Sequence, residues 1–433
     1  MRRIIVAILS LFFCVSAHAA SIISDTEIES VIGELIAPIT AAANIPHANI
    51  RIVDDDNFNA FVMGGTDIYI YTGLLTRVRT PNALRAVVAH ELGHTIGGHM
   101  AQMSARMETE MKRTMIIQAL GVGLMLAGGN PSLGAGALVG ASGIARQSML
   151  SFSRDEERVA DNMGFDLMVR AGYNPNGFID VFNQMNDMTA VIESKINPNA
   201  INHPLTSERL KNMREKLVAG DIKNKKFKSD DAGTVRRYDM VRAKLVGYLD
   251  TDSRIKTLYP NSDKSDAAIY ARAIANMRFG NLNGAAVGTR TLIARNPKNP
   301  YFYELLGDLE YRFGHYDDAI AAYTRATELR PNSPMVDVAH ALVLVERRAD
   351  GDISRAIELC KRAILHDESP IAYWVLARAY GSDDGRADWA MAEYYRTQNK
   401  PDKSREYARR AKSRLKPDSP EYIKSDDILK TTK

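Results

Sequence analysis

The five residues His90 to His94, with the sequence HELGH, hold two imidazoles and one carboxylate at a spacing that suits metal chemistry. Residues at positions i and i+4 lie on one face of a helix. Both imidazoles can therefore point at one metal ion while Glu91 projects beside them toward a bound water. The chemistry indicated is peptide hydrolysis at a zinc centre, with Glu91 as the general base. Two surface histidines on an ordinary helix are the alternative reading.

A helix must carry this motif, and the residues before it predict one. Thr80 is a suitable N-cap, Pro81 is compatible with a first helical turn, and Leu84, Val87 and Val88 follow at helical spacing. Glycines within and just after the motif permit close approach of other backbone. We therefore expect a helix that begins near residue 80 and carries both histidines.

The third protein ligand decides the class of peptidase. In the metzincin pattern a histidine stands six residues after His94, but Met100 occupies that position here. His99 is one residue out of register, and we interpret it as a polar residue at the helix end. A carboxylate from a second helix is the remaining option.

The segment from Ser153 to Asp161 offers such a carboxylate. Glu157 and Asp161 are four residues apart, so on a helix Glu157 can bind the metal while Asp161 accepts a hydrogen bond from the outer nitrogen of a ligand histidine. Glu156 competes for the ligand role, but Ala160 stands four residues after it. The sequence therefore favours one zinc per chain, with Glu157 as its third ligand and Asp161 as a supporting acid.

Several short motifs occur together, and through them the chain resembles the CAAX prenyl protease and HtpX-like zinc metallopeptidases, in particular periplasmic members with tetratricopeptide repeats. The resemblance covers roughly residues 45–250 and the architecture of the tail. It implies zinc binding by His90, His94 and Glu157, catalysis by Glu91, and a catalytic role near the metal for His203. For His203 two roles stay open: stabilising the oxyanion, or occupying the water position in a resting state. The motifs are Asn59-Ala60-Phe61, Thr72-Gly73-Leu74-Leu75, His90 to His94, Ser153-Arg154 with Glu157 and Ala160-Asp161, and His203-Pro204 with Arg209.

Residues 58–71 are typical of a β-hairpin with a two-residue turn at Gly64-Gly65. A strand beside the zinc helix could pair with an extended substrate, which makes Asn59, Ala60 and Phe61 candidate substrate-binding residues. Recognition would then be mainly through backbone and would favour unfolded proteins over one sequence. A purely structural hairpin is the alternative.

A stretch without charged residues, 114–145, lies between the two expected metal-binding helices. The part before the break at Gly128-Gly129 is too short to cross a bilayer. We expect a buried hairpin or a flap that makes peripheral contact with membrane or with unfolded protein.

Residues 1–20 read as a secretory signal peptide: Arg2 and Arg3, an apolar run, then a small-residue site that predicts cleavage after Ala19 or Ala20. We therefore expect a periplasmic protein. Cys360 is the one cysteine outside that segment, so no intramolecular disulfide is expected. A formal net charge of +4 over 433 residues gives no indication of a nucleic-acid partner.

The second half of the chain shows a 34-residue period, which is that of tetratricopeptide repeats. It appears in three pairs of positions: Gly280 with Gly314, Pro297 with Pro331, and Pro300 with Pro334. The predicted fold class is α+β, with a mainly helical metallopeptidase domain around a small sheet, followed by an α-solenoid. The expected domains are a signal peptide (1–20), the metallopeptidase (21–262), the repeats (265–417) and a C-terminal tail (418–433).

These features predict a periplasmic zinc endopeptidase of protein quality control. Its expected substrates are misfolded or stalled envelope and outer-membrane proteins, and its repeats would hold substrates or the outer-membrane assembly machinery. The rival interpretation is a non-enzymatic chaperone or adaptor that uses the repeats. Bound zinc and cleavage that depends on Glu91 would discriminate the two.

Overall fold

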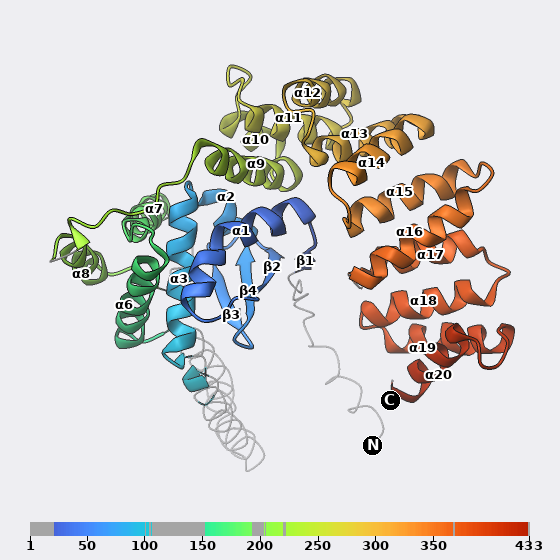
Figure 1. Cartoon of the computed structure of the whole chain (residues 1–433), viewed down its shortest axis with the longest axis horizontal. Helices are drawn as coiled ribbons and strands as arrows, with labels where there is room; N and C mark the ends of the chain where they lie inside the picture. The colour runs from blue at the N-terminus through green and yellow to red at the C-terminus, as the bar shows by residue number, and fades with distance from the viewer. Residues whose placement is uncertain are drawn as a thin grey trace, which may run out of the picture.

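The computed structural model describes residues 21–99, 101–103, 105, 152–192, 203, 205–219, 222–366 and 369–431. In these ranges a helical domain built around a small sheet is followed by a curved stack of helices (Figure 1). The predicted signal peptide (1–20) and the stretch 114–145 lie outside the described residues. Within the described ranges, no helix has both the length and the apolar character needed to cross a bilayer.

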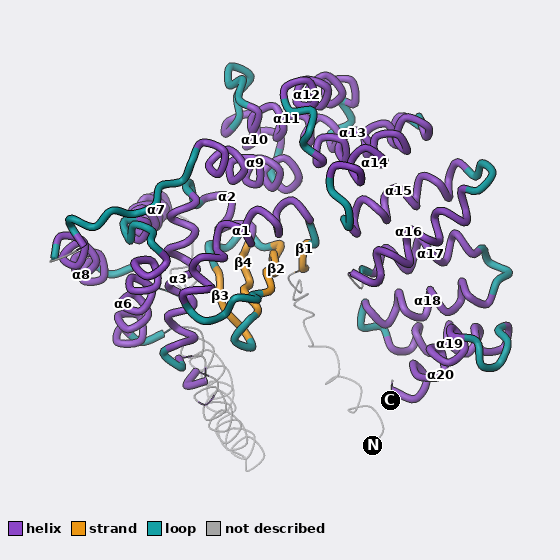
Figure 2. The backbone as a smooth tube through the Cα atoms, in the orientation of Figure 1, coloured by secondary structure: helices purple, strands orange, loops and turns teal. Residues whose placement is uncertain are grey.

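Four short strands form one sheet in the first domain (Figure 2): β1 (Ser21–Ile23), β2 (Asn49–Asp54), β3 (Ala60–Met63) and β4 (Asp67–Tyr71). Their order is β1-β2-β4-β3, with the central pair parallel and both outer pairs antiparallel. Strands β3 and β4 form the predicted hairpin, in which Met63 pairs with Asp67. Gly64 and Gly65 both adopt positive φ, which glycine tolerates. The connection has three residues rather than the two expected.

Helix α3 (Pro81–Ile96) runs through the centre of this domain, and every residue from Ala83 to His94 is buried. A helix that is buried all round needs neighbours on every side. Helices α1, α6 and α7 and strand β3 pack around it. The other helices of the domain are α1 (Thr26–Ala42), α2 (Thr72–Arg77), α6 (Arg154–Ala171), α7 (Gly177–Ile192) and α8 (Ser207–Val218).

Small residues allow α3 and α6 to pack backbone against backbone. A Cβ added at Gly93 would lie 2.5 Å from the carbonyl oxygen of Ala160, and one added at Gly164 would lie 3.0 Å from that of Ala89. Backbone cannot move aside as the end of a side chain can, so larger residues do not fit at these two glycines. Gly93 stands between the two candidate ligand histidines. The contact therefore sets the separation of the helices that carry the site.

The second part of the chain is a stack of helices in which each packs on its neighbours in sequence. Pro300 and Pro334 each begin the first helix of a pair, and Gly280 and Gly314 adopt positive φ between the two helices of a pair. The predicted period thus corresponds to helix hairpins, and the predicted fold class is confirmed. The helices are α11 (Asp266–Arg278), α12 (Leu282–Arg295), α13 (Pro300–Phe313), α14 (Tyr316–Leu329), α15 (Pro334–Arg347), α16 (Asp352–His366), α17 (Pro370–Tyr380), α18 (Gly385–Thr397), α19 (Pro401–Arg414) and α20 (Pro420–Thr431).

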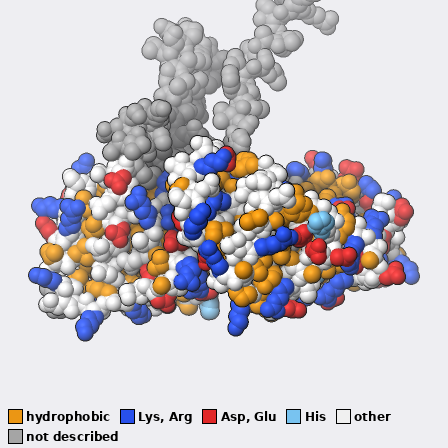
Figure 3. Space-filling model, turned by 90° about the horizontal axis from the view of Figure 1, so that it is seen from above, with side chains coloured by type: hydrophobic (Ala, Val, Ile, Leu, Met, Phe, Trp, Pro, Cys, Tyr) orange, Lys and Arg blue, Asp and Glu red, His pale blue; other side chains and the backbone are white. Residues whose placement is uncertain are grey.

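Helix α20 lies in the segment 418–433 that we expected to be a tail. It packs on α19 and α18, and its Ile428 is buried. The helical stack therefore continues to residue 431. On the face shown in Figure 3, basic and acidic side chains are interspersed over the whole length of the described molecule.

Helices α9 (Ala232–Leu249) and α10 (Asp252–Leu258) join the two parts, and α9 packs against both α11 and α1. Lys244 of α9 is buried and places its Nζ 2.7 Å from Asp25 and 3.2 Å from Glu27, at the start of α1. Tyr270 of α11 donates a hydrogen bond to the same Glu27 at 2.9 Å. Unpairing buried charges is costly. The first domain and the repeats therefore share a buried ionic cluster, although the expected domain boundary at 262–265 separates them.

We expect Gly93→Ala to lower the free energy of unfolding by about 1–3 kcal/mol, because its Cβ would collide with the backbone of α6. Gly33→Ala on α1 is the matched control. A Cβ there meets only the side-chain end of Ile50, at 3.3 Å. Denaturant unfolding of the metal-free proteins measures both effects. Equal stability of the two variants would contradict the close packing of α3 and α6.

Candidate metal centre

Helix α3 directs His90 and His94 toward one point. The helix begins as predicted: the Thr80 hydroxyl accepts a hydrogen bond from the N–H of Ala83 at 3.1 Å, and Pro81 occupies the first turn. One turn separates the two histidines, and their Nε2 atoms lie 3.2 Å apart. Both side chains are buried.

Helix α6 brings Glu157 to the same point. Its N-terminus is a capping box, in which the N–H of Ser153 donates to Glu156 Oε2 at 2.8 Å and the N–H of Glu156 donates to Ser153 Oγ at 3.3 Å. This cap occupies the Glu156 carboxylate. Glu157 Oε2 instead lies 3.3 Å from His90 Nε2, and its Oε1 lies 3.6 Å from His94 Nε2. The structure therefore places Glu157, and not Glu156, beside the histidines.

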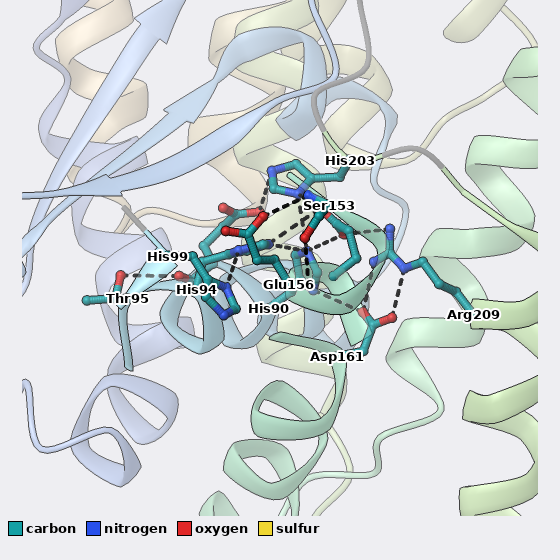
Figure 4. A network of polar contacts seen from close by, with 11 residues as sticks. His90, His94, Thr95, His99, Ser153, Glu156, Asp161, His203 and Arg209 are labelled. Carbon is teal, nitrogen blue, oxygen red and sulfur yellow. Dashed lines mark hydrogen bonds and ion pairs between the residues drawn. The ribbon is translucent and has the colours of Figure 1, made fainter. Parts of the chain in front are cut away.

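His203 packs against His90 and His94 (Figure 4) and also against Glu157. Its Nδ1 lies 3.3 Å from His90 Nε2 and 2.8 Å from Glu157 Oε1, and its Nε2 lies 3.6 Å from Glu91 Oε1. One ligand atom each from His90, His94, Glu157 and His203 falls within 4.8 Å of the others. Four ligands about 2.1 Å from a tetrahedral zinc lie about 3.4 Å apart. The cluster could therefore hold a single metal ion.

The electrostatics of the cluster favour a cation. Asp161 Oδ1 lies 3.0 Å from His90 Nδ1. Burial alone would lower the pKa of His90, yet the contacts with Asp161 and Glu157 raise this pKa to about 10. Buried carboxylates thus stabilise positive charge at this point, which is what a divalent metal ion would supply. The nitrogen and oxygen donors fit zinc.

Glu91 lies beside the cluster and is buried. Burial raises the pKa of its carboxyl, and the neighbouring His203 and His90 act in the opposite direction. A carboxylate with a raised pKa is a stronger base, which suits a group that accepts a proton from water.

Arg209 has a position that the sequence did not predict, although it belongs to one of the motifs. Thr206 caps α8 and sets Arg209 in its first turn, where the side chain is 8% exposed. Its Nη1 lies 2.7 Å from Glu157, and its Nε and Nη2 each donate to Asp161 at 2.8 Å. One guanidinium therefore orients both acids of α6. The sequence signal was the acid pair Glu157 and Asp161, one helical turn apart, because two acids that become buried together need a cation.

Two further side chains touch the cluster. Phe152 stacks on His94 with ring centroids 3.8 Å apart and lies 5.2 Å from the ring of His203. Our interpretation of His99 as a polar residue at the helix end was incomplete, because His99 is buried and its Nδ1 lies 2.9 Å from His94 Nδ1. No sequence pattern indicated Phe152, since the fold of α6 onto α3 creates its contacts.

An apolar cavity of about 50 Å³ adjoins the cluster. Asn59 and Ala60 line it, together with Glu91. Phe61 does not: its ring stacks on Tyr69 with centroids 4.7 Å apart. Of the candidate substrate-binding residues, the structure thus brings two to the cavity. Its remaining lining residues are Phe58, Leu74, Ala86, Val87, His90, Phe178, Val181, Phe182, Met185, His203 and Arg209.

Comparison with known families agrees with this organisation. Residues 23–217 match Peptidase family M48, and residues 270–334 match a tetratricopeptide repeat. The first part of the chain is therefore similar to M48 peptidases, and the second part is similar to tetratricopeptide repeat proteins. The first range contains every residue of the cluster.

Three curated relatives are similar to this chain. The beta-barrel assembly-enhancing protease of Escherichia coli (strain K12) is 26% identical over 322 residues, which cover 72% of this chain and 64% of the relative. The protein of that name from Yersinia pestis is 24% identical over 373 residues, covering 83% and 74%. Metalloprotease LoiP of Escherichia coli (strain K12) is 27% identical over 177 residues, covering 40% and 65%. The chain thus spans somewhat less than two thirds of the first of these relatives.

We expect Glu157→Ala to lower zinc occupancy sharply, because it removes a donor from the cluster. Glu156→Ala is the matched control, since that carboxylate caps α6 and its loss should cost only about 0.5–2 kcal/mol of stability. Metal analysis of the two purified variants by mass spectrometry measures occupancy. Equal losses of zinc would remove Glu157 from the ligand set.

Proposed function

Because residues 23–217 match Peptidase family M48, we propose that this chain is a zinc-dependent endopeptidase. The observation that carries the proposal is the convergence of His90, His94 and Glu157 on one point, with Glu91 beside that point and lining an apolar cavity. This arrangement supports the proposal, because it offers a candidate donor set, a candidate general base and space for a substrate side chain.

His90, His94 and Glu157 would hold one zinc ion per chain. Zinc held by such donors would acidify a water and polarise a carbonyl group. The Glu91 carboxylate would accept a proton from the attacking water and pass it to the leaving amine. Asp161 and Arg209 hold the donors in place, since Asp161 lies against His90, and Arg209 contacts Glu157 and Asp161.

His203 occupies a fourth corner of the cluster, where its Nδ1 is within 3.3 Å of both His90 and Glu157. Of the two roles that the resemblance leaves open, this geometry favours the one in which His203 takes the water position in a resting state. The imidazole would then have to swing away before a substrate is cleaved, and in the displaced position it could serve the oxyanion.

An extended, unfolded segment fits the site as substrate. Strand β3 is at the edge of the sheet and pairs only with β4 among the described strands. Its backbone can therefore receive a further strand. Asn59 and Ala60 would present backbone beside the cavity, and Phe61 would contribute only its backbone, because its ring lies on Tyr69. The apolar cavity would take an apolar side chain next to the scissile bond.

The relatives and the repeats support a proposal for the cellular role. The printed name of the Escherichia coli relative is beta-barrel assembly-enhancing protease. Stacked helix hairpins offer a long curved surface for proteins. We infer a periplasmic role in quality control of misfolded or stalled outer-membrane proteins, with the repeats holding substrates or assembly machinery.

The rival function is a chaperone or adaptor without proteolysis. The repeats alone would serve it. A cluster of metal-binding side chains and a buried Glu91 beside an apolar cavity are not needed for such a role, so the site geometry favours the peptidase.

Glu91→Gln should retain zinc but lose proteolysis of an unfolded substrate such as reduced casein by about 10²–10⁴-fold, because the amide keeps the shape and cannot accept a proton. Glu215→Gln, on the exposed face of α8, is the control and should cleave normally. Normal cleavage by a zinc-loaded Glu91→Gln protein would overturn the mechanism, and absence of cleavage by the wild type would favour the rival.

Val181→Trp should fill the cavity and reduce cleavage next to large apolar residues relative to alanine by about tenfold or more. Val218→Trp is the control, because Val218 is 68% exposed on α8. Mass spectrometry of the products of an unfolded protein gives the cleavage-site preference. An unchanged preference in a folded, active Val181→Trp protein would exclude the cavity from substrate recognition.

A further inference from the structure

Helix α3 ends in a sharp turn that returns an imidazole to the metal cluster. Gly97 closes the helix, Gly98 adopts φ +70°, and His99 then folds back, 4% exposed. His99 Nδ1 lies 2.9 Å from His94 Nδ1 (Figure 4). Of the ring nitrogens of His94, Nε2 faces the cluster and Nδ1 faces His99.

The two glycines are what this turn requires. A Cβ added at Gly97 would lie 2.6 Å from His99 Nε2, so a side chain there would displace the imidazole. Gly98 has a left-handed backbone that other residues adopt with strain. The turn formed by Gly97, Gly98 and His99, which we call the hook, therefore brings the imidazole of His99 into contact with that of His94.

The imidazole of His99 is not needed to end the helix. The N–H of Gly97 donates to the carbonyl of Gly93, and the N–H of Gly98 donates to that of Thr95. The backbone of the turn thus satisfies these terminal carbonyls of α3. The end of the helix therefore does not explain why the ring of His99 is buried.

We propose that His99 is a positioning residue for the metal ligand His94, an inference that rests on the proposed zinc site. With Nε2 of His94 facing His90 and Glu157, its Nδ1 carries the proton and donates to His99 Nδ1. This bond fixes the tautomer and the ring plane of His94. Phe152 stacks on the face of the same ring.

The two ligand histidines are therefore supported differently. His90 has the Asp161 carboxylate at its outer nitrogen, and His94 has the imidazole of His99. A second carboxylate at this position would add another buried negative charge to a cluster that already holds Glu91, Glu157 and Asp161. An imidazole accepts the hydrogen bond without that charge.

The test is the zinc dissociation constant of the full chain, measured by competition with a fluorescent chelator. His99→Leu should bind zinc about 10–100-fold more weakly. His99→Gln keeps a hydrogen-bond acceptor and should stay within about threefold of wild type. His340→Leu is the matched control, since it also removes a buried histidine, but from the repeats. It should bind zinc normally.

Cobalt substitution gives a second readout. The visible bands of the cobalt form should shift in His99→Leu and stay unchanged in His340→Leu. Gly97→Ala keeps the imidazole but displaces it, so it should weaken zinc binding even where His99→Leu fails to fold. Zinc binding by a folded His99→Leu or Gly97→Ala protein within twofold of wild type would overturn the proposal. Wild-type protein that binds no zinc would overturn the proposed function as well. Zinc binding without proteolysis would contradict only the function.

Discussion

The close packing of α3 on α6 is the constraint on which the site depends. Gly93 and Gly164 have no side chain where each faces the backbone of the other helix, at Ala160 and Ala89. At this separation, donors one turn apart on α3 meet the carboxylate of Glu157 on α6. Donors held on packed helices are positioned before the metal binds. A wider separation would leave Glu157 out of reach of the histidines.

Two buried ionic clusters then fix side-chain orientations and helix contacts that close packing alone does not determine. Arg209 orients Glu157 and Asp161 at the site, and Lys244 contacts Asp25 and Glu27 at the start of α1. Buried ion pairs contribute little net stability, but they penalise every arrangement that separates their partners. Helix α1 packs on α3 and also receives contacts from α9 and, through Tyr270, from the repeats. Helix α1 thereby connects the repeats to α3, the helix that carries the histidines.

Features of the fold and the site could be predicted from the sequence where the contacts that determine them are local. The cap at Thr80, the spacing of the histidines and the choice of Glu157 over Glu156 depend on residues within one or two turns of each other. The repeat period was visible for another reason, because the same residue types recur every 34 positions. The hairpin was predicted, but its turn has one residue more than expected, because the pairing of Met63 with Asp67 sets its length. Contacts between distant segments were not predictable. Arg209, Phe152 and the junction at Lys244 acquire their roles only when helices far apart in the chain pack together. The contact of His99 with His94 was missed for a different reason. The hook is local, but the metzincin spacing tests only for a direct metal ligand and does not detect a residue that supports one.

The account is tested most directly by zinc-edge X-ray absorption of the purified chain. The geometry predicts four nitrogen and oxygen donors at about 2.0–2.1 Å, with the outer scattering of three imidazole rings and one carboxylate. Outer scattering from only two imidazole rings would show that His203 lies outside the coordination sphere. A six-coordinate, oxygen-rich environment with one imidazole or none would contradict the assignment of the metal centre to α3 and α6.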